Sequence, residues 1–71
     1  MSELSKMQMY FLRALADKYK SALKAGGAGK AIKETDVVKS LPNGSHTFTY
    51  KGRNFVISVD GSEATISAIK N

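Results

Sequence analysis

The sequence contains no cysteine and no tryptophan, and it has one proline and one histidine among its 71 residues. Without cysteine the chain can form neither a disulfide framework nor a thiolate metal site. No stretch approaches the roughly 18 apolar residues of a membrane-spanning helix, and the first residues lack the basic and then apolar pattern of a secretion signal. These absences predict a protein of the intracellular, cytoplasmic space without a transmembrane segment.

Acidic residues are also scarce, and they show no catalytic or metal-binding spacing. The chain has six Asp and Glu residues and eleven Lys and Arg residues, which gives a formal net charge of +5. His46 is the single histidine. Its neighbour Ser45 points to the opposite side of a strand, so the two cannot act as base and nucleophile. We therefore expect no enzyme activity, no catalytic residue, no metal and no cofactor, and a preference for anionic partners.

A glycine-rich segment, residues 26–30, is not a phosphate-binding loop. Such a loop needs a glycine five residues before its Gly-Lys pair and a Ser or Thr after it, whereas this chain has Lys24 and Ala31 at those positions. Glycine readily adopts the left-handed conformation that ends helices. Residues 26–29 are therefore predicted to form a flexible hinge after a helix.

That helix is predicted to be long and to occupy residues 1–25. Ser5 and Gln8 have the spacing of a capping box, in which the side chain of each residue accepts a hydrogen bond from the backbone N–H of the other. Apolar residues then gather within about 80° of the helix circumference, at about 100° per residue. They are Leu4, Met7, Phe11, Leu15 and Ala22. We expect this face to pack on the rest of the fold.

A short second helix is predicted over residues 30–41. Three apolar residues there have rough helical spacing, namely Ile32, Val38 and Leu41. Pro42 disfavours helical geometry in the residue before it, so the helix should end at this point.

From His46 onward the apolar period changes to two, which is typical of strands. Two-residue turns at 51–52 and 60–61 divide residues 46–70 into a three-stranded antiparallel meander. These turns place Phe48 opposite Phe55, Phe55 opposite Ile66, and Ile57 opposite Ala64. One face of the meander, predicted to pack against the helix, then carries Phe48, Tyr50, Phe55, Ile57, Val59, Ala64, Ile66 and Ala68. The sequence thus predicts one small α+β domain over residues 1–71, with a long N-terminal helix and a short second helix packed on the meander.

The apolar arc of the first helix is wider than packing on a sheet requires. Its margins extend it to about 200°, whereas a surface helix usually needs about 100°. Aromatic and aliphatic side chains left outside the core are good anchors for a partner. The predicted partner-binding residues are Tyr10, Leu12, Tyr19 and Leu23. The alternative is that the second helix covers them.

Basic residues form a second stripe on the same helix. Lys6, Arg13, Lys20 and Lys24 fall within about 40°, roughly opposite the narrow apolar face. The stripe is either the solvated back of the helix or an electrostatic contact for phosphate or an acidic protein. Nine of the eleven basic residues are lysine, which disfavours base-specific recognition because such contacts use mainly arginine.

These features favour a small non-catalytic binding protein that docks on a protein partner as an accessory, inhibitor or modulator. A thin core in so short a chain also leaves a homodimer open. The alternative function is a basic, sequence-nonspecific nucleic-acid-binding protein, whose affinity would fall steeply with salt.

Overall fold

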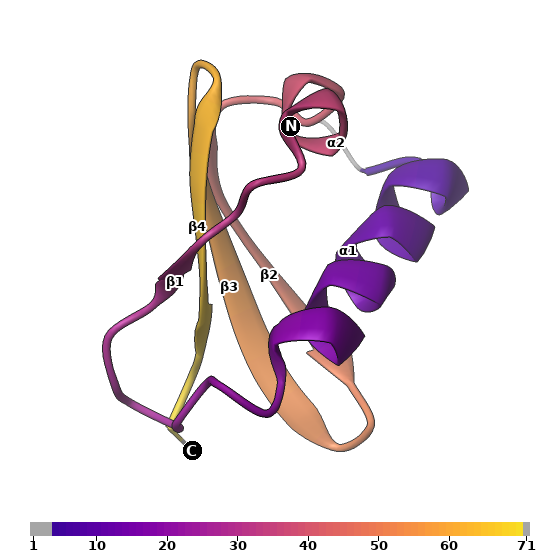
Figure 1. The fold of residues 1–71 in the computed structure, drawn as a ribbon. Coiled ribbons are helices and arrows are strands. Elements are labelled where there is room, and N and C mark those ends of the chain that lie inside the picture. Colours follow the sequence, from indigo (N-terminus) through magenta and orange to yellow (C-terminus); the bar gives the residue numbers. More distant parts are fainter. Residues whose placement is uncertain (1–3, 71) are drawn as a thin grey trace.

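The computed structural model describes residues 4–70, which form an α+β fold of two helices and one antiparallel sheet (Figure 1). Both helices lie on the same side of the sheet. The elements in chain order are α1 (Lys6–Tyr19), β1 (Lys30–Ala31), α2 (Thr35–Lys39), β2 (Gly44–Tyr50), β3 (Arg53–Asp60) and β4 (Glu63–Ala68). Their order across the sheet is β1-β4-β3-β2. The predicted ranges also include residues 1–3 and 71, which lie outside the described residues.

The sheet has four strands, so the prediction of three is wrong. The additional strand, β1, lies within the range predicted as the second helix, and it pairs antiparallel with β4 through Lys30↔Ile66 and Ala31↔Thr65. The next residue, Ile32, is buried, and its N–H donates to the Ala64 carbonyl at 2.9 Å. The helical part of that range is reduced to the five residues of α2.

Helix α1 begins at Lys6, directly after the predicted capping residue Ser5, and ends before residue 25, so it is shorter at both ends than the predicted range. The Gln8 N–H donates to Ser5 Oγ at 3.1 Å and the Ser5 N–H donates to Gln8 Oε1 at 2.7 Å, which confirms the capping box. After Tyr19 the backbone tightens into turns, because the Ala22 N–H bonds to the Tyr19 carbonyl, three residues back, at 2.9 Å. Leu23 lies in these turns and is buried in the core.

The glycine-rich loop is packed against β4, in contrast to the predicted flexible hinge. The Gly26 N–H donates to the Ala68 carbonyl at 2.9 Å. A Cβ at position 29 would lie 2.6 Å from Thr65 Cγ2 and 2.8 Å from the Ile66 carbonyl oxygen, so only glycine fits there. The close approach of two backbones therefore explains Gly29 better than loop mobility does.

The first hairpin has the predicted register. Lys51 and Gly52 form its turn with φ of 51° and 77°, the positive values that a two-residue type I′ turn requires. Phe48 lies opposite Phe55, and the two rings stack with centroids 5.5 Å apart.

The second hairpin differs from the prediction by two residues. Its turn is Gly61-Ser62, because glycine occupies the first central position and Asp60 pairs with Glu63. Phe55 therefore lies opposite Ala68, and Ile57 opposite Ile66. A shift of two residues leaves every side chain on the same face.

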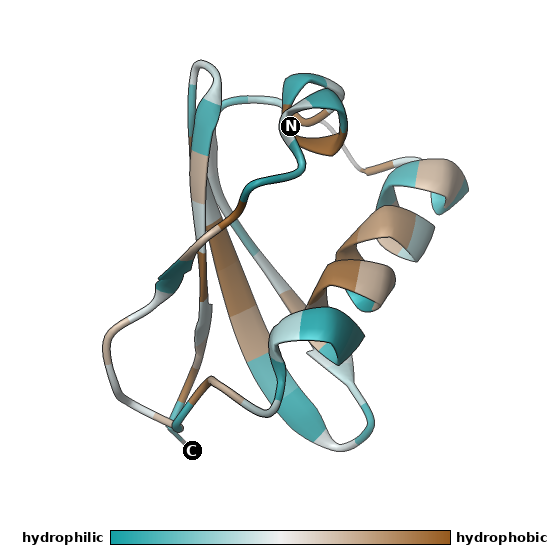
Figure 2. Ribbon diagram, in the orientation of Figure 1, coloured by the Kyte–Doolittle hydropathy of each residue, from teal (hydrophilic) through white to brown (hydrophobic). Residues whose placement is uncertain are grey.

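The core lies between the helices and one face of the sheet (Figure 2). The sheet residues predicted to face inward are buried: Phe48, Phe55, Ile57, Val59, Ala64, Ile66 and Ala68. Tyr50, also predicted to face inward, is half-buried against this core. The opposite face carries exposed hydroxyl-bearing side chains, with Val56 and Ile69 half-buried among them.

Candidate functional site

Helix α1 packs on the sheet through a different face from the predicted one. Leu12, Leu15 and Ala16 are buried, and Tyr19 is half-buried against the same core. At about 100° per residue, the centre of this face is rotated by roughly 80° from the predicted stripe. With this rotation, Met7 and Tyr10 lie away from the core.

Of the four predicted partner-binding residues, Tyr10 is at the surface, with 70% of its area exposed. Leu12 is 0% exposed and Leu23 is 5% exposed. The prediction of these two leucines as surface anchors is therefore corrected: both belong to the core, because the margin of the predicted arc is the packed face of α1. Tyr19 is half-buried and uses its hydroxyl within the chain.

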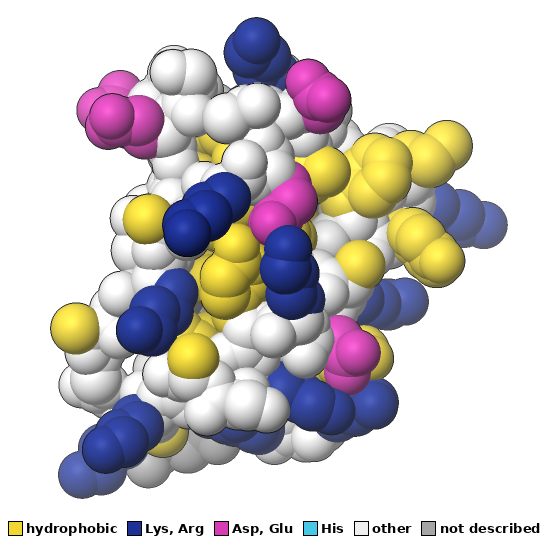
Figure 3. All heavy atoms as spheres, in the orientation of Figure 1, with side chains coloured by type: hydrophobic (Ala, Val, Ile, Leu, Met, Phe, Trp, Pro, Cys, Tyr) yellow, Lys and Arg dark blue, Asp and Glu magenta, His cyan; other side chains and the backbone are white. Residues whose placement is uncertain are grey.

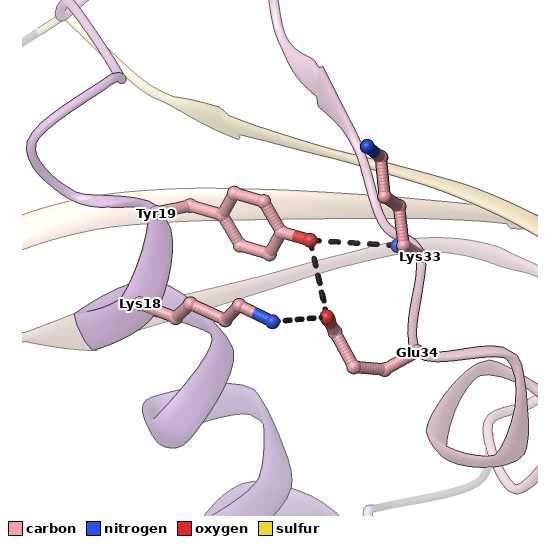
Figure 4. Close-up of polar contacts among 4 residues, drawn as sticks. All are labelled: Lys18, Tyr19, Lys33 and Glu34. Carbon is pink, nitrogen blue, oxygen red and sulfur yellow. Dashed lines mark hydrogen bonds and ion pairs between the residues drawn. The ribbon is translucent and has the colours of Figure 1, made fainter.

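The Tyr19 hydroxyl ties the end of α1 to the segment before α2 (Figure 4). It donates to the Glu34 carboxylate, with oxygen distances of 3.2 and 3.3 Å, and accepts from the Lys33 N–H at 3.4 Å. Lys18 Nζ forms an ion pair with the same carboxylate. The hydrogen bond from Lys18 holds the pKa of Glu34 below its usual value, and Glu34 raises the pKa of Lys18. This cluster has a structural role.

The exposed side of α1 carries an apolar pair. Within residues 4–70, Met7 and Tyr10 are the large apolar side chains left exposed, at 66% and 70%. The half-buried Phe11 meets the Tyr10 ring edge-on, with centroids 6.4 Å apart. Figure 3 shows apolar side chains gathered over the N-terminal half of α1, with basic side chains beside them. We refer to Met7 and Tyr10 as the apolar pair.

A hollow of 320 Å³ adjoins the apolar pair, between α1 and the end of β2. Its lining comes from Tyr10, Arg13, Ala14, Asp17 and Tyr50. The Asp17 carboxylate is neutralised within the chain, because Lys20 Nζ lies 3.1 Å and Lys51 Nζ 3.6 Å from Asp17 Oδ1. The hydrogen bond from Lys20 holds the pKa of Asp17 below its usual value. The hollow therefore combines two aromatic rings with an excess of positive charge.

The basic stripe is shorter than predicted. Lys6 and Arg13 lie exposed along α1, and Lys20 continues this line as the C-cap residue. The prediction that Lys24 belongs to the stripe is corrected, because α1 ends at Tyr19 and the backbone turns before residue 24. Lys20 is paired with Asp17, whereas Lys6 and Arg13 have no ion pair within the described part of the chain. These two residues carry the uncompensated charge beside the apolar pair.

Sequence reasoning missed Met7 as a surface residue and missed Tyr50 as a neighbour of Tyr10. The spacing of the apolar residues on the helix does not show which of them face the core and which face outward. The contact between α1 and the end of β2 depends on tertiary packing, for which the sequence holds no local signal.

The remaining chemistry of the described residues is limited. His46 Nε2 lies 2.7 Å from the Pro42 carbonyl oxygen. No group of three or more His, Asp or Glu side chains between residues 4 and 70 is arranged to hold a metal ion. Across the same residues, no helix has the length and apolar character needed to cross a membrane. Comparison of the chain with protein families, curated proteins and solved structures gave no significant match.

Proposed function

We propose that this protein is a small non-catalytic binding protein that docks on a protein partner through the exposed side of α1, as an accessory, inhibitor or modulator. The observation that carries the proposal is the exposure of the apolar pair, Met7 and Tyr10, at 66% and 70%. Tyrosine is enriched among the residues that dominate binding energy, because its ring offers a large apolar area at a low cost in side-chain entropy. Methionine adapts to irregular partner surfaces.

The charges beside the pair define the chemistry of the partner. Lys6 and Arg13 lie exposed next to it without an ion pair inside the described chain. Their positive charge suits a protein surface that has an apolar pocket with carboxylates at its rim. Arg13 is the better placed of the two for a bidentate contact with a carboxylate, because the guanidinium group is planar.

Nucleic acid is the alternative partner, and Lys6, Arg13 and Lys20 would then contact phosphates. Two observations favour the protein. First, Lys20 already forms an ion pair with Asp17 at 3.1 Å. Second, the residue between Lys6 and Arg13 on this side of the helix is the exposed Tyr10, and the exposed Met7 lies one turn away. A methionine contributes nothing to backbone phosphate contacts.

Capture of partners from the native cell, with and without nuclease, tests the proposal. We expect a protein partner to be retained after nuclease treatment and to be lost with Tyr10→Asp. A contact at an interface hot spot contributes about 2 kcal/mol, so affinity for the purified partner should fall about 30-fold. Ala28→Asp, an exposed position away from α1, is the matched control and should bind normally.

Two results would contradict the proposal. One is loss of the captured material on nuclease treatment, which would identify nucleic acid. The other is equal binding by the Tyr10→Asp and Ala28→Asp proteins, which would place the contact elsewhere on the molecule.

A further inference from the structure

The two edges of the sheet are protected very differently. Edge strand β1 has two residues, and lysines at positions 30 and 33 accompany it. Short length and lysine are devices that keep a sheet edge from pairing with another chain. Edge strand β2 has seven residues, Gly44–Tyr50, with no charged side chain and no proline. Its register with β3 is continuous, so it also lacks a bulge.

The free backbone groups of β2 belong to three hydroxyl residues. Tyr50 and Arg53 close a two-residue turn, and such a closing pair exchanges hydrogen bonds. Bonded and non-bonded pairs then alternate along the hairpin. Ser45, Thr47 and Thr49 therefore direct their N–H and C=O groups away from β3. All three residues are exposed, and no hydrogen bond between residues 4 and 70 occupies these groups.

We propose that β2 pairs antiparallel with β2 of a second copy of this chain, about a two-fold axis at Thr47. Thr47 then faces its own counterpart, and Ser45 faces Thr49 of the second copy. Each of the three residues donates and accepts a backbone hydrogen bond across the axis. The result is one continuous sheet through both copies. This pairing is separate from the docking of α1 on another protein.

Charge at the two ends of β2 favours a second copy over another extended segment. The Gly44 end lies beside the hairpin that carries Asp60 and Glu63, because Gly44 pairs with Val59. The opposite end carries Lys51, whose Nζ also lies 3.6 Å from Asp17 Oδ1 of its own chain, and Arg53. Antiparallel pairing of two copies brings the basic end of each beside the acidic end of the other.

The separation between these charged ends is within reach of their side chains. In the proposed register, Lys51 and Asp60 of the second copy lie in one row two strands apart. Two strands span about 10 Å, which a lysine and an aspartate side chain can largely bridge. Each copy has a formal net charge of +5, so an uncharged strand between complementary ends is a suitable place for two copies to meet.

Sedimentation of the full chain over a concentration series tests the proposal. We expect a concentration-dependent dimer for the unchanged protein. Thr47→Lys and Thr47→Asp should each sediment as a monomer, because like charges then meet on the axis. An equimolar mixture of the two variants should recover the dimer. Thr65→Lys is the matched control: Thr65 is exposed on the same face of the sheet but in the interior strand β4, so its variant should remain dimeric.

Circular dichroism shows whether each variant keeps its strands. If either charged variant unfolds, Thr47→Pro replaces it, because proline removes an N–H that faces outward and is tolerated on an edge strand. This variant should be a folded monomer. A monomeric unchanged protein, a dimer that persists in the position-47 variants, or a mixture that stays monomeric would each overturn the proposal. None of these outcomes alters the expectation for Tyr10→Asp.

Discussion

The Tyr19 hydroxyl joins two segments that are distant in the sequence. Its ring packs against the core, while its oxygen contacts the Glu34 carboxylate and the Lys33 N–H. A tyrosine with an apolar body and a bonded tip is typical of a residue at the boundary of a core. The same residue type at Tyr10 has its ring at the surface, so the two tyrosines differ in role: Tyr19 contributes to the fold, and Tyr10 is proposed to contact a partner.

Tyr19→Phe is expected to lower the free energy of unfolding by about 1 kcal/mol. The variant keeps the packed ring but loses the hydrogen bonds of the hydroxyl, and a net contribution of about this size is usual for such bonds. Urea unfolding followed by circular dichroism measures the change. Tyr10→Phe is the matched control, because no hydrogen bond to the Tyr10 hydroxyl is formed within the described chain. Equal stability of the two variants would contradict the role assigned to Tyr19.

At the scale of the elements, the sequence predicts which face each strand buries better than it predicts where elements pair or end. The inward residues of β2, β3 and β4 follow from alternation alone, and a register error of two residues does not change them. The beginning of α1 follows from the Ser5 and Gln8 capping box. These features depend on local chemistry, which a sequence contains in full.

The elements that were not predicted depend on tertiary contacts. Strand β1 has only two residues, and its identity rests on pairing with β4. Helix α1 ends at Tyr19, where backbone turns replace the helical pattern before the buried Leu23. Its wide apolar arc fits the sheet in more than one rotation, so Leu12 and Tyr10 could not be assigned to the inside and the outside from spacing alone. For this reason, the sequence predicted only part of the candidate site, namely Tyr10 and its basic neighbours Lys6 and Arg13.

The contact between α1 and the segment before α2 should depend on pH. Lys18 lowers the pKa of Glu34 below its ordinary value of 4.5. A carboxylate with a depressed pKa in the folded state stabilises the fold fully above its unfolded-state pKa. This contribution is lost as the pH falls through the folded-state pKa. The free energy of unfolding should therefore decrease as the pH falls below the unfolded-state pKa of Glu34 and on through its lower folded-state pKa.

Glu34→Gln should make that decrease smaller, and urea titrations at a series of pH values measure it. Lys18→Met removes the other partner of the ion pair and should reduce the pH dependence in the same direction. The double variant should show no further reduction, because both single changes remove one interaction. An unchanged pH dependence in all three variants would show that Glu34 does not contribute to it.

At the scale of the whole molecule, the described structure separates its surfaces by chemistry. The exposed side of α1 combines the apolar pair with uncompensated positive charge. The open edge at β2 is uncharged and offers backbone groups. We propose a separate contact for each of these two surfaces, one with a partner protein and one with a second copy of the chain.

Because the chain has a formal net charge of +5, the salt dependence of binding distinguishes a protein partner from a nucleic acid. If the protein docks through Met7 and Tyr10, its dissociation rate should depend mainly on apolar contacts, whereas charge should affect mainly the association rate. Surface plasmon resonance over a salt series, with the captured partner immobilised, should show an association rate that falls with salt and a dissociation rate that changes little. Arg13→Gln should weaken the salt dependence of association. Binding to a phosphate backbone would instead give an affinity that falls with a log–log slope of about −0.9 for each neutralised phosphate, and that result would contradict docking through the apolar pair.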